Sequence, residues 1–162
     1  MFPILPLEQY EALCRRCGMS CHTPILLGSK IVIIPEIHCR FLVYDTAGKA
    51  GCAVYENRHE IAPWCRTAED ALGLHALAHD CPYAAGIPGY KGKHWAKDWE
   101  HEAIVAVLRD RLVTEGLTIE DSPESALRLF GEGWTYEEAE DGTRNVFRKA
   151  VTTCSIDRVA QK

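Results

Sequence analysis

A chain of 162 residues has the length of one ordinary domain, and its composition, 47% hydrophobic and 25% charged, is that of a folded protein rather than a disordered one. The net charge of −5 argues against a general nucleic-acid-binding protein, which would carry a basic face. The chain begins without the basic segment of an export signal, and its longest apolar run, residues 31–35, is far too short to span a membrane. The sequence therefore predicts a cytoplasmic protein without a membrane or nucleic-acid partner.

The first predicted elements lie around the first cysteines. Apolar spacing predicts a helix over residues 7–17, and Gly18 would end it. Cys14 and Cys17 would then lie at the C-terminal end of this helix. A continuous β-branched run over residues 31–34 predicts a buried strand.

A β-hairpin is predicted next. The β-prone runs 39–45 and 52–56 flank a turn that contains glycine. In this arrangement Cys39 lies at the end away from the turn, whereas Cys52 lies near the turn.

The following segment is predicted to be a helix and then a loop. Thr67 has the sequence context of a helix cap, and the helix would continue to about His79. Cys65 would lie just before this helix and Cys81 just after it. Glycines and prolines predict a loop over residues 82–93.

The C-terminal part is predicted to be helical and then to form a second hairpin. An amphipathic helix is expected over residues 95–114, and Ser122 followed by Pro123 should open a shorter one. The runs 134–140 and 143–151 flank an Asp-Gly turn and predict the hairpin.

These elements predict an α+β fold. Residues 1–93 would form a small cysteine-rich region organised by metal, with a hairpin and helices. Residues 94–162 would add helices and the second hairpin, packed on the same single domain.

Eight cysteines are the most informative feature of the composition. The cytosol keeps thiols reduced, so a set of cysteines in a cytoplasmic chain favours metal ligation over disulfide bonding. Seven of them fall between residues 14 and 81, whereas Cys154 stands alone and is expected to be an ordinary small hydrophobic residue.

Three cysteines form the pattern C-x2-C-x3-C at Cys14, Cys17 and Cys21. Two residues between thiolates let both sulfurs face one ion, while the intervening backbone N–H groups stabilise the negative charge. Gly18 permits the tight turn that such a motif needs. With four more cysteines in the next sixty residues, the pattern indicates a metal site.

The cysteine-containing segments also occur in a recognisable order: Cys14-x2-Cys17-Gly18-x2-Cys21, Cys39-Arg40-Phe41-Leu42, Gly51-Cys52-Ala53-Val54-Tyr55-Glu56-Asn57-Arg58, Cys65-Arg66 and Asp80-Cys81-Pro82-Tyr83. This order resembles the zinc- or iron-chelating cysteine-cluster family, the YkgJ-like or CxxCxxCC proteins. The resemblance covers about residues 10–90 and implies a metal-binding function for that region. It says nothing about residues 95–162.

The chain departs from the family pattern at two positions. Ser20 stands where the family has a cysteine, and Arg58 is followed by His59 rather than by proline. His22 is a candidate to replace the missing ligand. The expected metal ligands are therefore Cys14, Cys17, Cys21, Cys39, Cys52, Cys65, Cys81 and His22.

Several arrangements of these ligands stay open. Two tetrahedral sites, one cubane with a separate ion, or one four-cysteine site with spare thiols would each use the donors present. Zn²⁺ is the expected metal because the adjacent Cys21 and His22 are typical of it, with an iron–sulfur cluster as the alternative.

No phosphate-binding loop, dinucleotide-binding turn or nucleophile elbow is present in the sequence, so an enzyme is not favoured. The preferred hypothesis is an accessory, maturation or complex-subunit protein with a largely structural metal, docking on another protein through residues 95–162. The alternative is a redox protein or enzyme that uses an iron–sulfur cluster or an open metal site.

Overall fold

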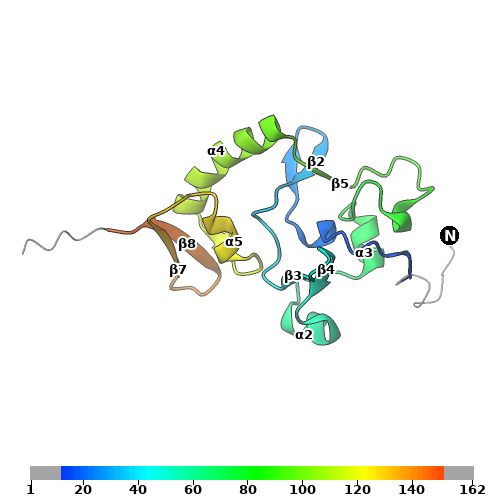
Figure 1. Cartoon of the computed structure of the whole chain (residues 1–162), viewed down its shortest axis with the longest axis horizontal. Helices are drawn as coiled ribbons and strands as arrows, with labels where there is room; N and C mark the ends of the chain where they lie inside the picture. Colours follow the sequence, from blue (N-terminus) through cyan, green and yellow to red (C-terminus); the bar gives the residue numbers. More distant parts are fainter. Residues whose placement is uncertain (1–11, 152–162) are drawn as a thin grey trace, which may run out of the picture.

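The computed structural model describes residues 12–151, which form the predicted α+β fold from small sheets and short helices (Figure 1). The strands are β1 (Ile25–Leu27), β2 (Lys30–Ile33), β3 (Leu42–Tyr44), β4 (Ala50–Cys52), β5 (Lys93–Trp95), β6 (Leu117–Thr118), β7 (Trp134–Glu138) and β8 (Arg144–Lys149). The helices are α2 (Arg58–Ile61), α3 (Ala68–Gly73), α4 (Asp98–Thr114) and α5 (Pro123–Leu127), with 3-10 turns at Met19–Cys21, Tyr55–Asn57 and Pro82–Ala84. Within residues 12–151, none of the helices is long and apolar enough to cross a bilayer.

The first sheet joins the two halves of the sequence. β1 and β2 form an antiparallel hairpin, and β5 pairs in parallel with the other edge of β2, with Ile33 opposite Trp95. The sequence predicted loop up to residue 93 and helix from residue 95. That prediction is wrong here, because strand β5 occupies this position and α4 begins only at Asp98.

The two predicted hairpins are present, but the first has a different register. β3 and β4 pair antiparallel with Leu42 opposite Cys52, so Cys52 lies at the end of the hairpin away from the turn. The expectation that Cys52 lies near the turn is therefore wrong. The consequence is favourable for a site, because Cys39, three residues before Leu42, lies at the same end.

The second hairpin, β7–β8, has the predicted Asp-Gly turn and gains a third strand, β6. Ser122 caps α5 as expected, because its hydroxyl accepts a hydrogen bond from the backbone N–H of Ser125 at 3.2 Å.

Two predicted helices end earlier than expected. Residues 12–13 are helical but residues 14–18 are not, so Cys14 and Cys17 follow the helix instead of ending it. The part of this prediction that falls on residues 7–11 lies outside the described residues. α3 is capped by Thr67 as predicted but ends at Gly73, well short of residue 79.

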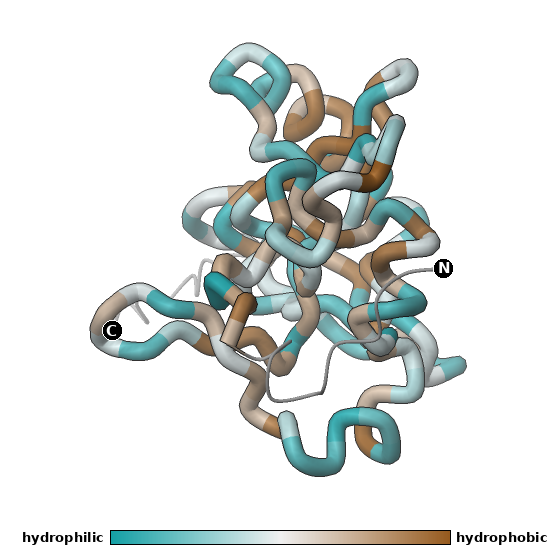
Figure 2. The backbone as a smooth tube through the Cα atoms, turned by 90° about the vertical axis from the view of Figure 1, so that its right-hand side faces the viewer, coloured by the Kyte–Doolittle hydropathy of each residue, from teal (hydrophilic) through white to brown (hydrophobic). Residues whose placement is uncertain are grey.

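The main hydrophobic core lies between the first sheet, α4, α5 and the last hairpin. Its fully buried members include Val32 of β2, Ile34 directly after β2, Ala126 of α5 and Phe147 of β8. Both halves of the sequence therefore contribute to one core. Figure 2 shows hydrophilic segments at several of the outer loops, as this packing requires.

Gly92 allows two segments to approach closely. Its φ of +56° is left-handed, and a Cβ atom there would lie 2.4 Å from the backbone Cα of His79. Gly89 has a similar φ of +72° but open space around it.

We predict that Gly92→Ala lowers the free energy of unfolding by about 3 kcal/mol. The alanine would have an unfavourable left-handed φ, and its Cβ would also clash with the backbone of His79. Gly89→Ala, which has the left-handed cost alone, should lose only about 1 kcal/mol. Urea denaturation followed by circular dichroism measures both values. Equal losses would contradict the close approach.

Candidate metal centre

The segment from Cys14 to Cys21 is held against the β3–β4 hairpin. The backbone N–H of Ala50 donates to the carbonyl of Arg16 at 2.8 Å, and Arg16 Nε donates to the carbonyl of Ala50 at 2.8 Å. Gly18, with φ of +76°, lies so close that an added Cβ would be 2.9 Å from the Cβ of Ala50. The glycine predicted to permit a tight turn is thus also needed for this contact.

A buried lysine holds the same segment from the other side. Lys93 of β5 is 2% exposed, and its ammonium donates to the backbone carbonyls of Met19 at 3.3 Å, Ser20 at 2.9 Å and His22 at 2.7 Å. Burial lowers the pKa of Lys93 to about 8, while the nearby thiols of Cys21 and Cys17 act in the opposite direction. The sequence offered no signal for this role, because β5 itself was not predicted.

The fold gathers four of the predicted ligands from separate segments. The backbone N–H of Cys39 donates to the carbonyl of Cys21 at 2.7 Å, and the pairing of Leu42 with Cys52 places β4 beside them. Cys65 follows Trp64, whose ring stacks on Phe41 with centroids 6.1 Å apart. We call Cys21, Cys39, Cys52 and Cys65 the four-thiol group.

The thiol of Cys21 interacts electrostatically with the other members of the four-thiol group. Burial raises the pKa of Cys21 to about 11, Ser20 lowers it through a hydrogen bond, and the other three members of the four-thiol group raise it further. The pKa of Cys65 is also raised, first by burial, whereas Arg58 acts against the rise. Neighbouring thiolates would repel one another, so without a cation the thiols of Cys21 and Cys65 favour the protonated form.

The three remaining predicted cysteines also interact with one another. Arg15 makes a two-pronged ion pair with Asp80, at 2.9 and 2.7 Å, which ties the Cys14–Cys17 segment to Cys81. Burial raises the pKa of Cys81, and Cys17 and Cys14 raise it further. Cys14, Cys17 and Cys81 therefore form a second set of interacting thiols, and Cys17 lies near Lys93 as Cys21 does.

The donor chemistry fits a thiolate-bound metal, although the side chains do not form a closed coordination shell. All seven cysteines are free thiols. Four thiols from four segments match the ligand number of a tetrahedral zinc or iron–sulfur site. Across residues 12–151, however, no three or more His, Cys, Asp or Glu side chains are arranged so that they could hold a metal ion.

His22 lies in a different environment from the thiols. It is 2% exposed, its Nδ1 is 3.0 Å from the carbonyl oxygen of Gly18, and its ring contacts His38 and Trp95 with centroids 5.4 and 4.8 Å away. Burial lowers the pKa of His22 to about 4, and the neighbouring His38 and Lys93 lower it as well. A neutral imidazole that donates from Nδ1 to Gly18 accounts for these contacts.

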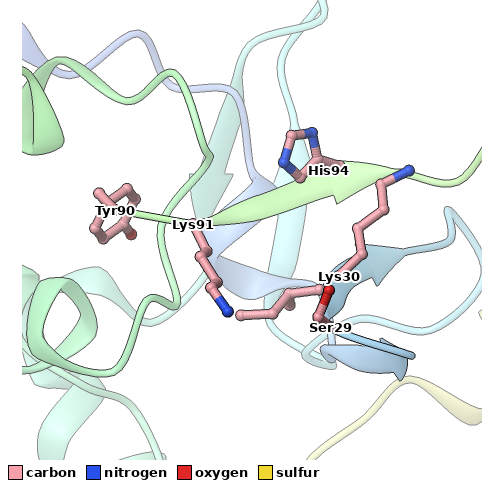
Figure 3. Close-up of a pocket in the computed structure, with 7 residues that line it drawn as sticks. Ser29, Lys30, Tyr90, Lys91 and His94 are labelled. Atoms are coloured by element: carbon pink, nitrogen blue, oxygen red, sulfur yellow. The ribbon is translucent and has the colours of Figure 1, made fainter. Parts of the chain in front are cut away.

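A separate hollow of about 350 Å³ lies beside β5. Figure 3 shows Lys91 extending from the segment before β5 toward Ser29 and Lys30, with His94 on the strand itself. Lys30 is paired with the buried carboxylate of Glu100 at 2.9 Å, so its charge is already compensated.

No protein-family model, curated protein or solved structure matches the chain.

The environment of His22 predicts a pH dependence. The pKa in the folded protein, about 4, lies below the ordinary value of 6.5, so the unfolded chain binds more protons between these values. The stability from His22 is therefore complete above pH 6.5 and falls as the pH drops toward 4. Between pH 7 and pH 5, the wild type should lose about 2 kcal/mol more stability than His22→Asn, by urea denaturation.

The same variant tests whether His22 is a ligand. We predict that His22→Asn has the same metal content after purification as the wild type, because Asn preserves a donor toward Gly18. Loss of metal in this variant, or an unchanged pH dependence, would contradict the assignment of His22 as a buried neutral histidine.

Proposed function

We propose that the chain is a metal-binding cysteine-cluster protein and that the four-thiol group is its principal site. The observation that supports this most is the convergence of Cys21, Cys39, Cys52 and Cys65 from four segments as free thiols. Four half-buried thiols that interact with one another have no evident structural advantage over aliphatic side chains, whereas thiolates are strong ligands for zinc and iron.

The metal would complete the fold of this region. The segments carrying the four thiols are short strands, 3-10 turns and loops, with little helix to hold them. A bound cation would stabilise thiolates that otherwise repel one another and would draw the sulfurs together, so metal binding and local folding are coupled. This coupling favours a largely structural metal and an accessory, maturation or complex-subunit role for a cytoplasmic protein that contacts another protein through residues 95–162.

Zn²⁺ is the preferred metal. Four cysteines at one place satisfy its tetrahedral preference completely and leave no position for substrate, which is typical of structural zinc. An iron–sulfur cluster would use the same four thiols and would make the protein a redox protein or enzyme.

The first test is elemental analysis and absorption spectroscopy of protein purified without oxygen. The proposal predicts about one tightly bound metal ion per four-thiol group, colourless if zinc. A brown protein with iron and acid-labile sulfide would replace zinc with a cluster at the same residues. Protein without either metal, in which every thiol titrates freely, would contradict the proposed function.

Single substitutions locate the site. We predict that Cys39→Ser or Cys52→Ser lowers metal affinity by at least about tenfold, because a neutral hydroxyl replaces a thiolate ligand. Cys154→Ser is the matched control and should keep the metal content of the wild type. Competition with a chromophoric chelator measures the affinities. Equal metal affinities in the three variants would exclude the four-thiol group as the metal-binding site.

A further inference from the structure

α4 carries a stripe of exposed, mostly apolar residues that faces away from the core. Its buried side holds Ile104 and Leu112, whereas Trp99 is 63% exposed and Val113 is 38% exposed. The helix runs along an outer edge of the molecule (Figure 1). An exposed tryptophan on a rigid helix is a frequent anchor of protein interfaces.

The stripe lies on one helix face from end to end. The exposed positions Trp99, Ala103, Ala106, Asp110 and Val113 follow one another at intervals of four and three residues. At 1.5 Å per residue, Trp99 and Val113 are about 21 Å apart along the helix axis. The two alanines between them leave room for another helix to approach closely.

A hollow of about 260 Å³ lies at the C-terminal end of the same face, lined by Arg109, Asp110, Val113, Phe130 and Trp134. This lining matches the chemistry of an indole, because the apolar and aromatic side chains can contact the ring. The carboxylate of Asp110 can accept a hydrogen bond from the indole N–H, and the guanidinium of Arg109 can interact with the face of the ring. The guanidinium is held in place because Arg109 Nε donates to the backbone carbonyl of Leu129.

We propose that two copies of the chain associate through antiparallel α4 helices, with Trp99 of each copy seated in this hollow of the other. Ala106 is midway between Trp99 and Val113, so a two-fold axis at Ala106 places each tryptophan opposite the Val113 end of the second helix. The interface is then isologous, and each hollow is filled by the same residue. The inference does not rest on metal binding, since α4 carries none of the thiols.

The test is sedimentation velocity on the full chain as isolated, from about 1 to 100 µM. The proposal predicts a concentration-dependent monomer–dimer equilibrium, and Trp99→Ala should raise the dimer dissociation constant at least about 30-fold. Leu26→Ala is the control, because Leu26 of β1 is 75% exposed but lies outside the stripe. It should leave the dissociation constant unchanged.

Two further variants test the geometry. Ala106→Glu would place two carboxylates face to face at the two-fold axis and should abolish the dimer, with the helix content unchanged by circular dichroism. Trp99→Phe keeps an aromatic ring but loses the N–H donor toward Asp110, and it should weaken the dimer less than Trp99→Ala.

A protein that stays monomeric across this range would overturn the proposal and would leave the stripe free for a different protein. A dimer that tolerates Ala106→Glu, or that weakens equally in Trp99→Ala and Leu26→Ala, would also overturn it.

Discussion

The buried ammonium of Lys93 is the interaction on which the cysteine-containing segment depends. A charge inside a protein is stable only when polar groups surround it, and here three backbone carbonyls from Met19, Ser20 and His22 do so. Because Lys93 belongs to β5 and β5 pairs with β2, these hydrogen bonds connect the segment directly to the sheet beside the main core. The segment is thus fixed although it has almost no regular secondary structure of its own.

With that segment fixed, the position of the other thiols follows from short-range backbone pairing. Cys39 bonds to the carbonyl of Cys21, and the register of β3 with β4 places Cys52 at the same end of the hairpin. Burial raises the pKa of Cys21 and of Cys65, and the neighbouring thiols raise both further, so these two side chains favour the protonated form in the absence of a cation. A metal ion would displace those protons, so its affinity should increase with pH.

Local signals predicted the parts of the fold that local interactions determine. The caps at Thr67 and Ser122 and the Asp-Gly turn of the last hairpin involve residues within a few positions of one another. The end of α3 at Gly73 was missed although its closing hydrogen bonds are local, because no residue there signals the left-handed backbone of His75, with φ of +55°. The strand β5 was missed because its pairing partner β2 is distant in sequence. β5 forms where Lys93 meets carbonyls more than seventy residues away, and no local pattern contains that information.

The candidate site, too, was predictable from the sequence only in part. The number and spacing of the cysteines predicted candidate ligands, whereas the interaction of Cys21 with Cys39, Cys52 and Cys65 is apparent only from the fold. The most direct test of the central claim is native alkylation with iodoacetamide, read by mass spectrometry, on the metal-loaded protein and after a chelator. We expect one protected set of thiols, Cys21, Cys39, Cys52 and Cys65, to become reactive together when the metal is removed. Four thiols that react independently, at rates the chelator does not change, would contradict it.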